Sequence, residues 1–425
     1  MSCQLPADCF NEIFEYLEEE QFDLYQCLLV NRLWCEVSVR ILWRNVVSHP
    51  FQMDKEDKED MLDKSQLYTL ISCLPEESKD LLYNNKIIST PNLKTPLFNY
   101  VSFCKVLSIN NIHYMINNFL SNRQLIDPNN FENIYLLTKE ILKMFMSQIS
   151  SLKELSFKTY DTFNYIYGFY DIVKDINGIT FTHFPGAKNC LKDLSELTCI
   201  RLHLEEVLSL SFISKFINLQ ELVISFYEYN SFKDIQYIIF PQLEILKFVN
   251  RCPKVEMLIK FLENNGKNLK EFCSHRCDNS LSLSIVKFCP NLRFLYVQFM
   301  ERETVKMIFD SCQQLESIEV WSDRENLKGK EVLEIVTKHS PKNFHKLRLY
   351  ESNISELHSE DLESFFIGLN NRVLQKPLSF IIHNVQDDYL FHDDSLEKND
   401  EINRMIEKYK NLGVIKSMNI LLVIK

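Results

Sequence analysis

The residue types that carry most enzyme chemistry are present in this chain, but not at the spacing that such chemistry needs. Phosphate-binding loops, dinucleotide turns and nucleophile elbows require glycine, where the backbone takes a positive φ or approaches a ligand closely. The 425 residues include only seven glycines, all isolated, and none opens a Gly-x-Gly or Gly-Lys-Ser/Thr element. A catalytic dyad built on a histidine stays open, because its members meet in space rather than in sequence. No nucleophile motif indicates one.

One short segment, Cys273-Ser274-His275-Arg276-Cys277, brings residues of metal-ligating type close together in the sequence. No second Cys or His pair at finger spacing completes a set of four ligands, so we expect no metal and no cofactor. The 13 cysteines are scattered, and the start Met1-Ser2-Cys3-Gln4 has neither a basic segment nor an apolar stretch before a cleavage site. We therefore expect reduced thiols and a cytoplasmic or nuclear protein.

The charge balance argues against several kinds of partner. The formal net charge is -11 and the pI is near 5.5, so we expect no nonspecific electrostatic binding to nucleic acid or to anionic lipid. No run approaches 18 apolar residues, so we expect no membrane-spanning helix. With 46% apolar and 25% charged residues, the composition is that of a folded globular protein.

The first 47 residues predict three short helices. Leu5-Pro6 is a good helix start, because proline at the first helical position has its φ preset and loses only an unpaired N–H. The spacing of Phe10, Ile13, Phe14 and Leu17 then lines one helical face. A second apolar stripe follows through residues 24–41. So small a core is marginal alone, which predicts that the unit needs a partner.

The order of three blocks in this segment resembles an F-box. Residues 5–17 are similar to the opening Leu-Pro helix of that family, Val30-Asn31-Arg32-Leu33-Trp34 to its Val-Cys-x-x-Trp block, and Leu42-Trp43 to its terminal Leu-Trp. Asn31 stands where the family often has Cys. The resemblance covers about a tenth of the chain. It implies an F-box over residues 1–47. Large aromatic side chains dominate the core of so short a helical unit, so we expect Trp34 and Trp43 to pack in that core.

Residues 48–100 are expected to form a charged linker with short helices. The mixed charge run over residues 53–64 indicates a solvated loop or an exposed helix face. Pro75, Pro91 and Pro96 then interrupt the apolar content, which predicts short helices and irregular connections.

A repeat with an L-x-x-L-x-L core dominates the remainder of the chain. Copies begin at Leu152, Leu197, Leu219, Leu243, Leu269, Leu292, Leu315 and Phe344, and the Leu269 copy breaks off after Phe272. From Leu197 onward the steps are roughly 22 to 29 residues, the range of leucine-rich repeats. The step from Leu152 to Leu197 is about twice as long and indicates a degenerate copy or an insertion.

Helices and a cap are expected around these strands. Apolar residues at i, i+3, i+4 spacing predict convex helices near residues 255–262, 305–309 and 332–336. Cys289-Pro290-Asn291-Leu292 resembles the cysteine-containing class of leucine-rich repeat, with Cys289 as a small buried apolar group. Strands are predicted at residues 380–382 and 420–424, with a helix near 402–409. The predicted fold is thus α/β: a three-helix F-box, then a leucine-rich-repeat solenoid with a C-terminal cap over residues 101–425.

The combination of F-box and repeats implies a function by resemblance. Members of that family dock on a Skp-type adaptor, and through it on cullin and RING subunits, while the C-terminal domain holds the protein to be ubiquitinated. By this resemblance the chain is a non-catalytic substrate receptor of an SCF ubiquitin ligase, with an unidentified protein substrate. Two other hypotheses stay open: an interaction scaffold whose helices only cap the solenoid, and an unrecognised enzyme.

Two groups of site residues follow from these expectations. The small helical unit has more apolar residues than it can bury, which predicts an adaptor surface. Its residues are Leu5, Pro6, Ile13, Phe14, Leu17, Leu28 and Val30. Side chains alternate along a strand, so residues between the core leucines point away from the core and are the candidates for substrate binding. They are Arg201, His203, Lys247, Tyr296, Gln298, Glu319, Trp321, Arg348 and Tyr350.

Overall fold

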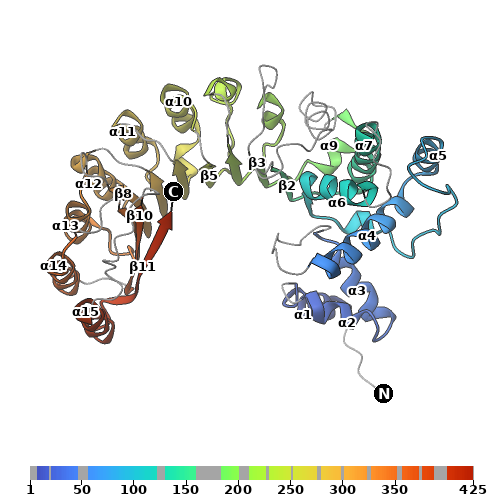
Figure 1. Cartoon of the computed structure of the whole chain (residues 1–425). Coiled ribbons are helices and arrows are strands. Elements are labelled where there is room, and N and C mark those ends of the chain that lie inside the picture. Colours follow the sequence, from blue (N-terminus) through green and yellow to red (C-terminus); the bar gives the residue numbers. More distant parts are fainter. Residues whose placement is uncertain are drawn as a thin grey trace. The chain divides into compact units, whose positions relative to one another are not determined.

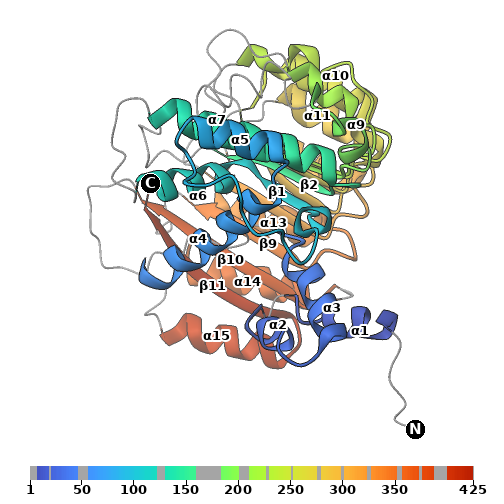
Figure 2. The same ribbon diagram turned by 90° about the vertical axis from the view of Figure 1, so that its right-hand side faces the viewer.

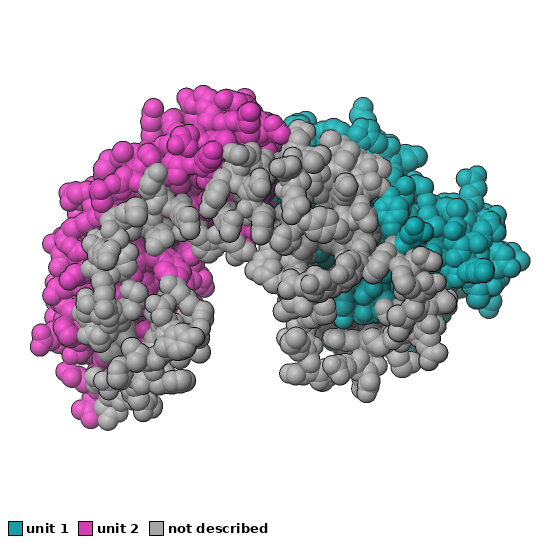
Figure 3. All heavy atoms as spheres, turned by 45° about the horizontal axis from the view of Figure 1, so that its top comes forward, with its two compact units in different colours: residues 1–218 teal, residues 219–425 magenta. Residues whose placement is uncertain are grey.

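The computed structural model describes residues 7–18, 21–45, 56–121, 130–158, 183–200, 210–225, 229–249, 252–274, 279–297, 301–322, 327–351, 357–372, 376–386 and 400–424. They belong to two compact units, residues 1–218 and 219–425, coloured separately in Figure 3. Among the described helices, none is both long and apolar enough to cross a membrane.

The first unit opens with the three predicted helices, α1 (Ala7–Glu15), α2 (Gln21–Cys27) and α3 (Arg32–Leu42). Both α1 and α2 pack against α3. Asn31, which departs from the family's Cys, is the N-cap of α3: its side-chain oxygen accepts a hydrogen bond from the Trp34 backbone N–H at 3.0 Å. A capping Asn satisfies an N–H that has no partner within the helix, so this departure stabilises the start of α3.

Helices dominate the middle of the first unit. In chain order its further elements are α4 (Glu56–Cys73), α5 (Glu76–Asn84), η1 (Tyr100–Phe103), β1 (Val106–Ser108), α6 (Ile109–Ser121), α7 (Asn130–Gln148), β2 (Glu154–Lys158), α9 (Ala187–Cys190), β3 (Glu196–Ile200) and η3 (Leu210–Lys215). Part of the charged run at residues 53–64 is therefore helical, as the first turns of α4. In Figure 2, α6 and α7 lie side by side near β1 and β2.

Backbone hydrogen bonds join the three N-terminal helices to the first strand. The carbonyl of Arg44, just past α3, accepts hydrogen bonds from the N–H groups of Lys105 at 2.7 Å and Val106 at 2.9 Å. Asn45 then forms a parallel bridge with Val106. The N-terminal helices thus continue directly into the edge of β1.

Strands β1, β2 and β3 are parallel, and β2 pairs directly with β3, with Leu155 opposite Leu197. No strand can therefore lie between them in the sheet. The long step from Leu152 to Leu197 is an insertion rather than a degenerate copy, and residues 159–182 of it lie outside the described part.

The second unit repeats a strand and a helical segment. Its elements are β4 (Glu221–Ile224), η4 (Tyr229–Asp234), β5 (Ile245–Phe248), α10 (Val255–Asn265), η5 (Gly266–Asn268), β6 (Glu271–Ser274), α11 (Asn279–Phe288), β7 (Phe294–Val297), α12 (Arg302–Ser311), β8 (Ser317–Ser322), α13 (Gly329–His339), β9 (Lys346–Glu351), α14 (Ser359–Asn370), β10 (Leu378–Gln386), α15 (Asp400–Asn411) and β11 (Ile415–Ile424). The strands pair in parallel and in chain order, and the helices form an outer row in Figure 1. The predicted α/β repeat fold and its final strands are confirmed.

Burial alternates along these strands as the repeat predicts. In β5, Leu246 and Phe248 are buried while Ile245 and Lys247 are half-buried, and β9 shows the same alternation. The Leu269 copy is not cut short, because β6 continues to Ser274. The Ser274 side chain is fully buried, and its hydroxyl oxygen lies 3.0 Å from the Cys252 sulfur at hydrogen-bond distance. A polar residue at a core position breaks the apolar pattern but not the strand.

Asparagine residues link successive repeats at their turns. The side-chain amide of Asn268 donates to the carbonyl of Pro241 at 2.9 Å, and that of Asn291 donates to the carbonyl of Lys267 at 2.9 Å. Each Asn stands directly before the first Leu of its repeat. Turn carbonyls that would otherwise lack a partner are thus satisfied by the next repeat.

Gly266 is required by close packing, since an added Cβ would lie 2.8 Å from the Cys289 sulfur and 2.9 Å from the Phe288 carbonyl oxygen. We expect Gly266→Ala to lower the free energy of unfolding by about 1–3 kcal/mol, the usual cost of overpacking. Urea denaturation measures it. An unstrained Gly→Ala change stabilises by about 0.4–1 kcal/mol, so an increase in stability would contradict this packing.

Candidate functional site

The N-terminal helices enclose a small apolar core. Phe14, Leu24, Val37 and Ile41 are buried in it, and the half-buried Trp34 packs against Phe14 with ring centroids 5.1 Å apart. The expectation that Phe14 belongs to an exposed adaptor surface is wrong, because its side chain is only 2% exposed. Neighbouring residues of a helix point about 100° apart, so Phe14 faces inward while Ile13 faces outward.

Among the described residues of this small unit, four large apolar side chains are exposed. Ile13 is 49% exposed, Tyr16 88%, Leu29 89% and Val30 57%. Tyr16 and Leu29 were not among the sequence-predicted site residues, although both lie next to predicted ones. Leu17 and Leu28 are half-buried, and Leu5 and Pro6 lie outside the described residues. We name Ile13, Tyr16, Leu29 and Val30 the N-terminal apolar patch.

Trp43 lies outside the buried cluster, contrary to the expectation for it. Its ring packs on Tyr100 of η1, with centroids 4.6 Å apart. Arg44 next to it forms ion pairs with Glu15 at 2.7 Å and Glu18 at 3.4 Å. Trp43 therefore packs the helices against the following segment rather than stabilising their own core.

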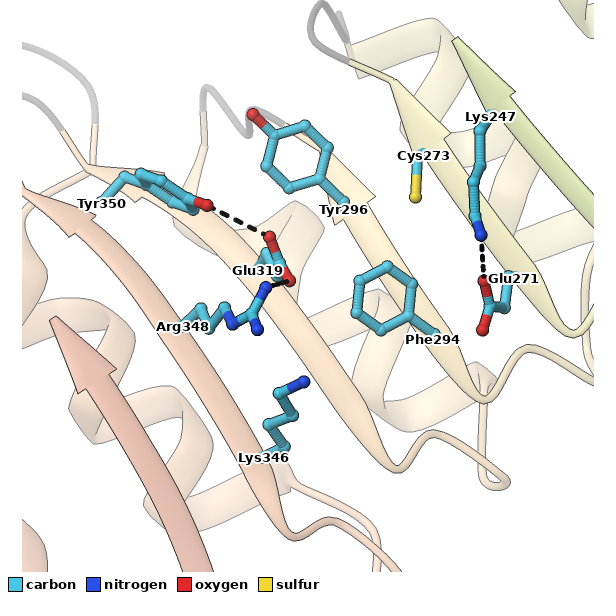
Figure 4. A pocket seen from close by; sticks show the side chains of 9 residues that line it. All are labelled: Lys247, Glu271, Cys273, Phe294, Tyr296, Glu319, Lys346, Arg348 and Tyr350. Atoms are coloured by element: carbon cyan, nitrogen blue, oxygen red, sulfur yellow. Dashed lines mark hydrogen bonds and ion pairs between the residues drawn. The ribbon is translucent and has the colours of Figure 1, made fainter. Parts of the chain in front are cut away.

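The second candidate site is a hollow of about 490 Å³, shown in Figure 4, on the strand face of the second unit. The outer helices lie on the opposite face of these strands (Figure 1). Strands β5–β9 supply its side chains. They are Lys247, Glu271, Cys273, Phe294, Tyr296, Glu319, Lys346, Arg348 and Tyr350. Five of them were predicted from sequence, namely Lys247, Tyr296, Glu319, Arg348 and Tyr350.

The other four lining residues were missed although the repeat contains a signal for them. Residues i and i+2 of a strand share a face, so the residue before each second core position also points into the open face. Glu271, Phe294 and Lys346 are the residues before the second core position of their repeats. Cys273 lies two residues after Glu271 on β6 and therefore faces the same side. Of the remaining predicted residues, Arg201, His203 and Gln298 lie outside the described part.

Aromatic rings stack along one edge of the hollow. Trp321 and Tyr350 are parallel at 4.9 Å, and His383 of β10 stacks on the other side of Tyr350 at 4.4 Å. The Trp321 indole N–H donates to the Tyr296 hydroxyl at 2.8 Å. Tyr296 is only 8% exposed, and burial raises its pKa to about 12. These contacts fix the rings in place, so a ligand would meet a preorganised surface.

Charged side chains are paired unevenly across the hollow. Lys247 lies 3.0 Å from Glu271 and 3.4 Å from Glu221. Burial opposes its charged form, but the hydrogen bond to Glu271 and the two carboxylate charges raise its pKa. At the other end Arg348 pairs with Glu319 at 2.6 Å, and Glu319 is 6% exposed. Burial and the charge of Arg348 lower the pKa of His383, so its ring is neutral at pH 7.

The described residues contain no group of three His, Cys, Asp or Glu side chains that could hold a metal ion. Burial raises the pKa of the Cys273 thiol to about 12, so it is a neutral thiol near pH 7 rather than a reactive thiolate. Cys312 is fully buried with its pKa raised to about 12, and burial raises that of Cys289 further. Cys289 and Cys312 are packing residues of the repeat.

Comparison with known families decides the nature of the N-terminal helices. Residues 2–49 match the family described as F-box-like. This chain begins with an F-box-like domain. The three helices, the capped α3 and the Phe14–Trp34 core are the structural form of that domain here.

The repeat that follows the F-box-like domain joins parallel strands and outer helices at a period of roughly 22 to 29 residues, which is the architecture of a leucine-rich repeat. The chain is similar to the crystal structure of the leucine-rich repeat-containing protein LegL7 from Legionella pneumophila, with 12% sequence identity and a TM-score of 0.34. That similarity covers 67% of this chain and 87% of the other. None of the curated proteins compared matches the sequence.

Proposed function

We propose that this chain is the substrate-recognition subunit of an SCF-type ubiquitin ligase. The F-box-like domain would bind a Skp-type adaptor, which bridges to cullin and RING subunits in the cytoplasm or nucleus. The repeats would hold the protein to be ubiquitinated. The observation that carries this proposal is the N-terminal apolar patch on a domain of the F-box-like family, because F-box domains generally bind adaptors of this type.

The chain itself would supply no reacting group. Holding a substrate lysine near a charged conjugating enzyme makes the transfer effectively intramolecular, which raises its rate by concentration and orientation alone. The hydrogen bonds from Lys105 and Val106 to the Arg44 carbonyl attach the F-box-like domain to β1. A fixed attachment of the F-box-like domain limits the positions that a bound substrate can sample.

A scaffold without a ubiquitin-ligase role is the second candidate. The bridge between Asn45 and Val106 favours it, because solenoids need a cap over their first repeat and the N-terminal helices meet the edge of β1. The two functions differ in one respect: a cap needs no adaptor.

The test replaces two residues of the N-terminal apolar patch, Ile13→Asp with Val30→Asp. Both side chains are about half exposed, so the fold should survive. Charges placed in an apolar interface should weaken adaptor binding by on the order of 100-fold. Binding is measured by calorimetry with the adaptor from the same organism, and circular dichroism checks folding.

A matched control carries Ile217→Asp and Leu412→Asp, which are 61% and 57% exposed and belong to the repeats. It should bind the adaptor like the wild type. Equal affinity of the patch variant and this control would show that the patch does not bind the adaptor, and no binding by the wild type would favour the scaffold.

A further inference from the structure

The hollow on β5–β9 has an unbalanced basic end. Among the described residues Lys346 takes part in no ion pair, while Arg348 beside it shares its charge with Glu319. Two cations thus face one carboxylate, which leaves about one positive charge. Lys346 and Arg348 are two residues apart on β9 and point to the same face, as Figure 4 shows.

Unused hydrogen-bond donors lie beside these cations. The Nε of Arg348 and the hydroxyl of Ser317 are buried and have no hydrogen-bond partner among the described residues. Ser317 is opposite Lys346 in the register of β8 and β9 and is only 7% exposed. Buried donors without acceptors are costly, and a ligand can supply an acceptor to these two only if the side chains that cover them move.

The opposite end of the hollow carries the opposite charge. Lys247 faces two carboxylates, Glu221 and Glu271, which leaves about one negative charge. Three strand spacings separate Glu271 from Lys346, or roughly 14 Å. Phe294 lies between them on β7 and gives the floor an apolar centre.

We infer that the hollow holds an extended segment of the target protein, with a single carboxylate side chain at Lys346 and Arg348 and an apolar neighbour over Phe294. This inference rests on the proposed function and names the chemistry of its substrate site. The charge of the site favours one carboxylate. The basic end has about one unpaired positive charge, and a phosphate carries about two negative charges, which Glu319 would repel. An acidic tract would be repelled by Glu271 and Glu221 at the other end.

The test uses the purified full-length chain and three pools of synthetic twelve-residue peptides. The pools share a random sequence without acidic residues and a fixed Leu beside the centre, and differ only in having Asp, phosphoserine or Asn at the centre. The Asp pool should be retained roughly tenfold better than the Asn pool, the gain of one charge-assisted contact. It should also exceed the phosphoserine pool.

Two charge-reversal variants localise the effect. Lys346→Glu should remove the preference for Asp over Asn. Lys338→Glu makes the same change at an exposed position of α13 on the helical side and should keep it. The inference is overturned if no pool is retained, if Asp and Asn pools bind equally, if phosphoserine exceeds Asp, or if both variants behave alike. None of these results affects adaptor binding, so a failure here is distinct from a failure of the proposed function.

Discussion

Trp34→Ala should abolish adaptor binding by unfolding the F-box-like domain. The indole packs against Phe10 at 5.8 Å and Phe14 at 5.1 Å. It covers a cluster in which, among the described residues, four apolar side chains are buried: Phe14, Leu24, Val37 and Ile41. Truncating a packed Trp costs about 3–5 kcal/mol. So small a core has little stability to lose, because short domains bury a small share of their surface.

Limited proteolysis measures this loss. In the Trp34→Ala variant we expect rapid cleavage within residues 7–45, while the repeats remain resistant. Trp43→Ala is the informative control, since Trp43 packs on Tyr100 and not in the cluster. It should leave the helices folded. If Trp34→Ala resists proteolysis like the wild type and still binds the adaptor, the cluster does not hold the domain together.

Removing the aromatic stack should separate substrate capture from adaptor binding. Trp321 and Tyr350 are half-buried on the open face, and their parallel rings offer the large rigid surface typical of binding hot spots. We expect Trp321→Ala with Tyr350→Ala to weaken target binding by on the order of 100-fold. Tyr296 is left unchanged, because at 8% exposure its truncation would disturb the sheet.

Affinity purification with the proteasome blocked, followed by quantitative mass spectrometry, provides the readout. The adaptor in each sample is the internal standard. Proteins captured by the wild type should disappear from the double variant while the adaptor stays. Capture of the same proteins at wild-type levels would move the substrate site to the loops or the C-terminal cap.

Periodicity predicted the elements whose side chains repeat regularly. The L-x-x-L-x-L cores became buried strand positions, and the apolar spacing over residues 255–262 became α10. The break after Phe272 was misleading, since hydrogen bonding lets Ser274 occupy a core position. The charged run at residues 53–64 gave no periodic signal for the start of α4, because its polar residues fit a loop and a solvated helix equally well.

The candidate sites were less predictable than the fold. Alternation placed Lys247, Glu319 and Arg348 on the open face. It did not show how unevenly their charges are paired, because each ion pair joins strands whose residues lie 20 to 30 positions apart in the sequence. Sequence spacing also could not separate Ile13, which faces solvent, from Phe14, which faces the core. That choice depends on where α3 packs against α1.

Reconstitution of the ligase tests the central claim most directly. The purified chain, the adaptor and a cullin–RING pair are combined with activating enzyme, conjugating enzyme and ubiquitin, and ubiquitin transfer to the chain's own lysines is followed by gel and mass spectrometry. A substrate receptor held at the ligase is itself close to the conjugating enzyme. We predict transfer that requires the adaptor and is lost with Ile13→Asp and Val30→Asp. A folded chain that neither co-elutes with the adaptor nor receives ubiquitin would contradict the account.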